Sequence, residues 1–244
     1  MKLIGTLKGT LLAGAVVAAS ATAALAEFPE RNIEIIHPWG PGNAMAMSQV
    51  VAKAMGEELG TDMPVISRPG AAGTKAQTTA MGKPADGYTI FDGYVAPLVL
   101  QPILGNADWS FKDFKPLSAA VANAFAIAGQ VDETRWSSFE EMMAYCKGNR
   151  GELRYSSGSR NNLPHMVIAK ALQSYDCVAQ NVPYTQDGNV FKDLSSKVLD
   201  FAFVNVGNFR SNPDKVKILL VLSELESSKK AFHGAPTIGE LGVD

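Results

Sequence analysis

The chain has few of the residues that build metal and redox centres. Its 244 residues include two cysteines and three histidines, too few for a four-ligand zinc framework at familiar spacing. No basic run of five or more residues occurs, and the 22 Lys and Arg residues are balanced by 24 Asp and Glu residues. This charge pattern argues against nucleic acid or anionic lipid as a main partner. The patterns G-x-x-x-x-G-K-[ST], G-x-G-x-x-G and G-x-S-x-G are absent, so no phosphate loop, dinucleotide fingerprint or hydrolase elbow is present. We expect no cofactor.

The first 26 residues have the three parts of a secretory signal peptide. A basic start with Lys2 and Lys8 precedes an apolar run over 11–19, and Ala24-Leu25-Ala26 is a small-x-small cleavage site. The alternative is a membrane anchor, because the uncharged stretch approaches the spanning length. Its alanine content and cleavage site favour export with cleavage after Ala26. In an oxidising compartment Cys146 and Cys177 are candidates for a disulfide bond, with two buried free thiols as the alternative.

The rest of the chain alternates short β-rich runs with helical patterns. From residue 32 onward we expect strands at 32–37, 63–66 and 88–91, and helices at 44–59 and 74–81. The rhythm restarts after residue 117, with strands at 153–156, 177–182, 199–204 and 217–222 and helices ending at Cys146, Tyr175 and Ser195. Such alternation predicts parallel sheets with right-handed crossovers. We therefore expect an α/β protein with two lobes of similar build.

Three loops follow strands and lead into helices, at 38–43, 68–73 and 156–162. In open α/β sheets ligands bind beyond the carboxyl ends of the strands, and helix N-termini favour anions. Arg160 lies in the third loop and can hold a carboxylate by two parallel hydrogen bonds. The alternative for each loop is an ordinary turn, which needs Gly, Asn and Ser for its own geometry.

Several short motifs occur in the order and spacing of one family. They are Phe28-Pro-Glu-Arg-Asn-Ile-Glu-Ile-Ile, Pro38-Trp-Gly-Pro-Gly, Arg68-Pro-Gly-Ala-Ala-Gly, Asp86-Gly-Tyr-Thr, Tyr155-Ser-Ser-Gly-Ser with His165, Val182-Pro-Tyr with Asp193-Leu, Asp200 and Asn205, and Pro236-Thr-Ile-Gly-Glu-Leu-Gly. Through them, the chain from Phe28 to Val243 resembles the Bug, or TctC-like, family of extracytoplasmic solute-binding receptors of tripartite tricarboxylate transporters. The resemblance implies a two-lobed periplasmic-binding-protein fold. Each lobe would be a mostly parallel sheet flanked by helices, and a ligand cleft would lie between the lobes.

The resemblance also implies which residues bind the ligand. The first lobe would contribute Trp39, Gly40, Pro41, Gly42 and Asn43; the second would contribute Ser156, Ser157, Gly158, Ser159, Arg160, Asn161, Asn162 and Asn205, with Tyr184, Gln186 and Asp187 on the far wall. Family members grip carboxylates through backbone N–H groups and bridging waters, which can hold a polar group nearly as well as a direct bond. One departure stands in the first loop, where Ala46 replaces an acidic residue that is usual in the family.

The implied organisation is a signal peptide at 1–26, a first lobe at 27–116, a second lobe at 117–225 and the start of a return to the first lobe at 226–244. Because family members usually continue past the late Pro-Thr motif, we expect the first lobe to be truncated at its C-terminal side. The implied function is a monomeric receptor, not an enzyme. It would capture a small carboxylate, either a di- or tricarboxylate or an aromatic acid, and deliver it to integral membrane transporter subunits.

Three alternatives stay open at this point. The protein could be a ligand sensor that docks on a membrane signalling protein, or a truncated, non-functional remnant. It could also be a secreted hydrolase that uses Ser156 or Ser157 with His165, which requires a serine hydroxyl within hydrogen-bond reach of the imidazole.

Overall fold

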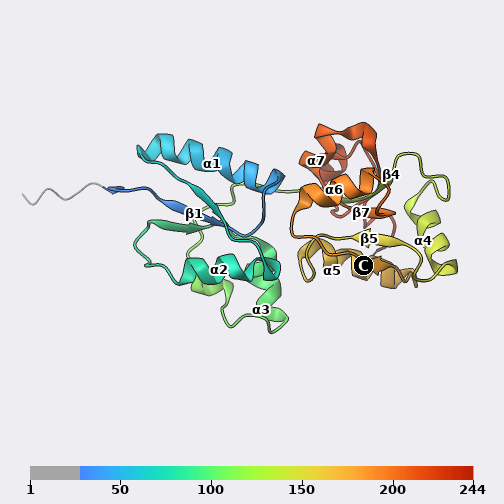
Figure 1. The fold of residues 1–244 in the computed structure, drawn as a ribbon, viewed down its shortest axis with the longest axis horizontal. Helices are drawn as coiled ribbons and strands as arrows, with labels where there is room; N and C mark the ends of the chain where they lie inside the picture. The colour runs from blue at the N-terminus through green and yellow to red at the C-terminus, as the bar shows by residue number, and fades with distance from the viewer. Residues whose placement is uncertain (1–27, 244) are drawn as a thin grey trace, which may run out of the picture.

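The first lobe is built on a small parallel sheet. The computed structural model describes residues 28–243, so the predicted signal peptide lies outside the described residues. The strands β1 (Glu34–His37), β2 (Val65–Ser67) and β3 (Thr89–Phe91) are ordered β2-β1-β3, and both pairings are parallel. Figure 1 shows the crossover helices on opposite sides of this sheet; they are α1 (Asn43–Leu59) and α2 (Thr74–Met81). A π-helical turn at Ala96–Leu100 continues into α3 (Gln101–Ile103).

The second lobe has a larger sheet in the order β6-β5-β7-β4-β8. β5 runs parallel to β6 and β7, whereas β4 runs antiparallel to β7 and β8. The strands are β4 (Phe125–Gln130), β5 (Arg154–Ser156), β6 (Gln180–Asn181), β7 (Phe201–Asn205) and β8 (Val216–Val221). The helices are α4 (Phe139–Gly148), α5 (Leu163–Ser174), α6 (Asp187–Ser195), α7 (Val206–Ser211) and α8 (Glu226–Ala231). The expected α/β fold with two mostly parallel sheets is confirmed (Figure 1).

Side-chain caps begin three helices of the second lobe. The Ser138 hydroxyl accepts a hydrogen bond from the Glu141 N–H at the start of α4. Asn162 caps α5 by accepting from the His165 N–H, and Asn205 caps α7 in the same way. Such caps satisfy N–H groups that the first helical turn leaves unpaired.

The hydrophobic core lies mainly in the second lobe. β4 is at its centre, and Ala126, Ile127 and Ala128 are all completely buried. A strand covered on both faces reads as a continuous apolar run. The strands expected from the sequence do not include β4, because an apolar run does not by itself disclose its neighbours.

The segment 226–243 requires a correction. The sequence predicted that the return to the first lobe begins here, but Phe232 and Val243 are buried in the core of the second lobe. Thr237 also pairs with Val221 at the end of β8. Burial of these apolar side chains stabilises the packing of the segment on the second lobe. The lobe boundary near residue 117 remains our proposal.

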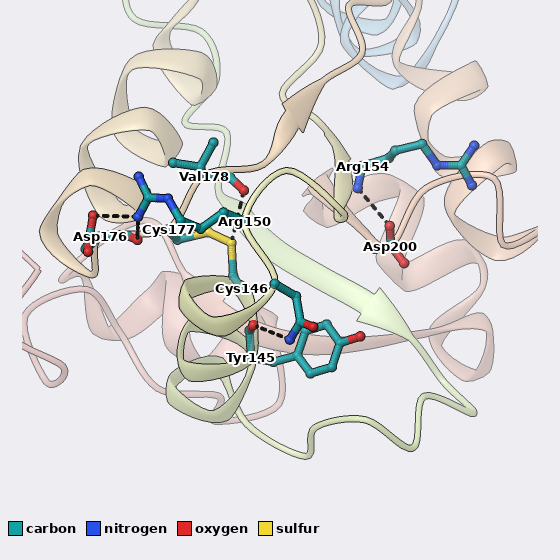
Figure 2. The surroundings of a disulfide bond; sticks show 9 residues. Tyr145, Cys146, Arg150, Arg154, Asp176, Cys177, Val178 and Asp200 are labelled. Atoms are coloured by element: carbon teal, nitrogen blue, oxygen red, sulfur yellow. Dashed lines mark hydrogen bonds and ion pairs between the residues drawn. A yellow bond between two sulfur atoms is a disulfide. The ribbon is translucent and has the colours of Figure 1, made fainter.

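A disulfide bond joins Cys146 of α4 to Cys177, just before β6 (Figure 2). The two Cα atoms are 5.2 Å apart, and both residues are buried. On the surface beside it, Arg150 pairs with Asp176 at 3.0 Å. Figure 2 also shows Asp200 accepting a hydrogen bond from the Arg154 backbone N–H, at 2.7 Å. Asp200 therefore serves the turn into β7.

Replacing both cysteines by serine should lower the free energy of unfolding by about 3–4 kcal/mol. The bond closes a loop with a sequence separation of 31 residues, and the chain-entropy model gives this magnitude for such a loop. Urea unfolding of the oxidised protein and of the Cys146→Ser/Cys177→Ser variant measures the difference. Reduced wild type should unfold like the variant; equal stability of all three samples would contradict the prediction.

Candidate functional site

The loops at the carboxyl ends of the two sheets lie against each other. The loop 38–42 leads from β1 into α1, and the N-terminus of α1 points toward the second lobe (Figure 1). Across from it, loops 157–162 and 182–186 follow β5 and β6. Asn205 ends β7 and precedes Gly207 in the first turn of α7.

Three close contacts join the two lobes here. A Cβ atom at Gly207 would lie 2.0 Å from Oδ1 of Asn43, and one at Gly40 would lie 3.0 Å from Cγ of Gln186. Both distances are too short for ordinary carbon contacts, so glycine permits the approach at each place. The Gln101 side chain, only 2% exposed, donates from Nε2 to the backbone oxygen of Asn161 at 2.6 Å. The two lobes are therefore closed on each other.

The hydroxyl groups of the second-lobe loop are used inside the loop. Ser156 and Ser157 are completely buried. The Ser156 hydroxyl accepts from the Gly158 N–H at 3.1 Å, and the Ser157 hydroxyl accepts from Nδ2 of Asn181 at 3.0 Å. Asn162 donates to the backbone oxygen of Ser157 at 3.0 Å. These side chains hold the loop in shape in front of α5.

A second layer ties this loop to the far wall. The Ser159 hydroxyl donates to the Tyr184 backbone oxygen at 3.2 Å, and the Tyr184 N–H donates to the Gly158 oxygen at 3.1 Å. The Tyr184 hydroxyl donates to Asp193 of α6 at 2.5 Å. Burial, and then the hydrogen bond to Asp193, raises the pKa of Tyr184 to about 12. The phenol therefore stays a neutral donor and fixes α6 to the loop.

Arg160 and His165 lie together at the start of α5. Arg160 is exposed and makes no ion pair with a carboxylate in the described part of the chain. His165 Nδ1 accepts a hydrogen bond from the Asn161 N–H at 3.1 Å. Burial, and then the Arg160 charge, lowers the pKa of His165 below its usual value. In the described part of the chain neither Ser156 nor Ser157 bonds to His165, because both hydroxyls and His165 Nδ1 have the other partners just described.

The site is suited to an anion. α1 has 17 residues and α5 has 12, and neither carries an acidic residue in its first turn. Gly42 provides no side-chain cap to α1, so backbone N–H groups of that turn keep their capacity to bind an anion. Arg160 adds a full positive charge beside α5. The N-termini of two helices and one arginine thus border the contact between the lobes.

Sequence reasoning missed two residues of this interface. Gln101 and Gly207 make interlobe contacts, yet neither belongs to a motif that points to a ligand. The loop 68–73, a candidate from its glycines, instead supports the first loop: a Cβ atom at Gly73 would lie 3.2 Å from Cβ of Pro38. Two surface hollows of about 660 and 330 Å³ lie on the second lobe, and no predicted site residue lines either of them.

Comparison with known proteins agrees with the fold and with the family resemblance. The family model described as "Tripartite tricarboxylate transporter family receptor" matches residues 47–244. BugT of Bordetella pertussis is 25% identical over 242 residues, covering 96% of this chain and 72% of BugT. MatC of Rhodopseudomonas palustris, solved with bound malate, superposes with a TM-score of 0.79 at 18% identity, over 88% of this chain and 74% of MatC. Rpa4515 of R. palustris, solved with adipate, superposes with a TM-score of 0.76 at 20% identity, over 88% of this chain and 73% of Rpa4515.

A two-lobed solute-binding receptor is the class of protein that this fold defines. The chain belongs to the TctC family, the receptors of tripartite tricarboxylate transporters. The resemblance seen in the sequence is confirmed. In residues 28–243 no helix has the length and apolar character needed to cross a membrane.

Replacing Arg160 by alanine should raise the pKa of His165 part of the way to its usual value. The arginine charge is the second cause of the lowered pKa, and burial, the first, remains in the variant. With only three histidines in the chain, an NMR titration of the imidazole signals measures the change. Arg150→Ala is the control, because Arg150 pairs with Asp176 on the surface. An unchanged His165 titration in Arg160→Ala would show that the guanidinium does not reach this ring.

Proposed function

We propose that this protein binds a small carboxylate between its lobes, in the periplasm, and delivers it to integral membrane subunits of a tripartite tricarboxylate-type transporter. One observation carries the proposal: the N-terminus of α1 and the loop that carries Arg160 into α5 both border the contact between the lobes. Charge-assisted hydrogen bonds from an arginine and backbone N–H groups are the strong contacts for a carboxylate. The malate and adipate bound by MatC and Rpa4515 support the same ligand class.

The proposed contacts come from the predicted residues of both lobes. Backbone groups of Trp39, Gly40, Pro41, Gly42 and Asn43 would face the carboxylate from the first lobe. Arg160 and the backbone N–H of Asn162 would hold it from the second, because the Asn161 N–H already bonds His165. The buried serines shape this loop, and bridging water extends its reach. Delivery then requires a lobe arrangement that the transporter recognises, and ligand binding favours the closed one.

A thermal-unfolding screen tests the ligand class. The exported protein is heated with mono-, di- and tricarboxylates, both aliphatic and aromatic. A ligand at 100 times its Kd adds about 2.7 kcal/mol to the free energy of unfolding, which raises the midpoint by roughly 5–10 °C for a protein of this size. A cooperative transition that none of the carboxylates shifts would contradict the proposal.

Arg160→Ala should weaken binding of the carboxylate found in this screen by about 1.5–3 kcal/mol, the range for hydrogen bonds to charged groups. Isothermal titration calorimetry measures the affinity. Arg150→Ala removes one surface arginine at the opposite end of β5 and should bind like the wild type. Equal affinities of all three proteins would place Arg160 outside the binding site.

A further inference from the structure

Three polar side chains from separate elements meet at the carboxyl edge of the first sheet. His37 ends β1, Asp92 directly follows β3, and Ser48 lies in α1. His37 Nδ1 is 2.7 Å from Oδ2 of Asp92. The Ser48 hydroxyl is 3.2 Å from the same ring nitrogen and donates to the same Asp92 oxygen. None of these residues belongs to the site described above.

Their position is the one where open α/β sheets bind ligands. α1 leads outward from β1 to β2, whereas α2 leads back past β1 to β3, and the two helices cover opposite sides of the sheet (Figure 1). The change of direction leaves a crevice beyond the ends of β1 and β3, the switch point of a 2-1-3 strand order. His37 and Asp92 stand at the two ends that border this crevice.

The chemistry of the pair leaves one acceptor unused. A carboxylate accepts hydrogen bonds and does not donate them, so Asp92 holds the ring proton on Nδ1. In its neutral form the ring then presents a lone pair at Nε2. That atom is buried and has no hydrogen-bond partner in the described part of the chain, and His37 is 0% exposed. A buried polar atom without a partner costs free energy unless a ligand or water satisfies it.

Aromatic contacts connect His37 to the first-lobe loop of the site. The His37 ring lies edge-on to Tyr94, with centroids 5.9 Å apart, and Tyr94 lies edge-on to Trp39 at 5.5 Å. Ser67, at the end of β2, donates to the Trp39 backbone oxygen at 2.7 Å. His37 thus lies directly under the loop whose Gly40 and Asn43 reach the second lobe.

We propose that His37 Nε2 accepts a hydrogen bond from a hydroxyl or amino group on the carbon skeleton of the bound carboxylate. Asp92 and Ser48 are positioning residues that fix the imidazole and its proton. The protein would then prefer a carboxylic acid that carries such a donor over the same acid without it, because a site built for a hydroxyl rejects the analogue that leaves its acceptor unpaired. This inference rests on the proposed function.

Matched ligand pairs test the preference by calorimetry. The probes are malate against succinate, 2-hydroxyglutarate against glutarate, and 4-hydroxybenzoate against benzoate. In the wild type, the hydroxyl-bearing member of a pair that binds should bind at least about tenfold more tightly. His37→Asn keeps an amide near Nδ1 for Asp92 and removes Nε2, so the affinity ratio should fall to about one. His233→Asn changes an exposed histidine of the second lobe and should keep the wild-type ratio.

Each outcome separates this inference from the function on which it rests. If carboxylates bind but the affinity ratio within each pair is near one in the wild type, the role of His37 is overturned and carboxylate binding stands. The same holds if the wild-type ratio is unchanged in His37→Asn. Failure of every carboxylate to bind overturns both. If His37→Asn does not fold, ¹⁵N NMR of the wild-type imidazoles decides. The Nε2 signal of His37 should shift with the hydroxyl-bearing ligand and not with its partner, and equal responses overturn the proposal.

Discussion

The close backbone contact between the two lobes is the constraint on which the rest of the site depends. Gly40 and Gly207 stand where a Cβ atom would meet Gln186 and Asn43 of the opposite lobe. This approach brings the N-terminus of α1 up to the second lobe, where Arg160 precedes α5. It also brings Gln101 close enough to bond Asn161. The carboxyl edges of both sheets face this contact. Hydrogen-bond donors from separate strand-helix units can therefore reach the same ligand.

Within that place, side chains and backbone have different tasks. The Ser156 hydroxyl accepts from the Gly158 N–H, the Ser157 hydroxyl accepts from Asn181, and the Asn162 amide donates to the Ser157 backbone oxygen. Tyr184 fastens this loop to α6. A loop held by these bonds keeps its shape and presents Arg160 to a ligand. Preorganised donors of this kind bind an anion without the entropy loss of ordering the loop on binding. The first lobe adds a different element, the buried His37 paired with a partly exposed Asp92 under its glycine loop.

The two lobes differ in how firmly they are built. The second has a continuous core around β4, a disulfide bond and the segment 226–243 packed on it. The first core cluster, Ile33, Ile35, Ala52 and Met63, lies on one face of its sheet. The second lobe is therefore the firmer platform, and the loops of the first lobe close against it. Closure then depends on a few interlobe contacts, and such an equilibrium responds to the binding energy of a small ligand.

Local patterns in the sequence determined the strand-helix rhythm, the glycine loops and the family. Periodicity, turn residues and capping act over a few neighbours, so they can be read along the chain. Only the tertiary structure decided that β4 lies in the middle of the second sheet and that 226–243 stays in the second lobe. It also decided that Gln101 bonds Asn161 and that Ser48, His37 and Asp92 meet. Each of these depends on contacts between residues distant in sequence, and no local pattern records which distant side chain will satisfy a buried polar atom or cover an apolar face.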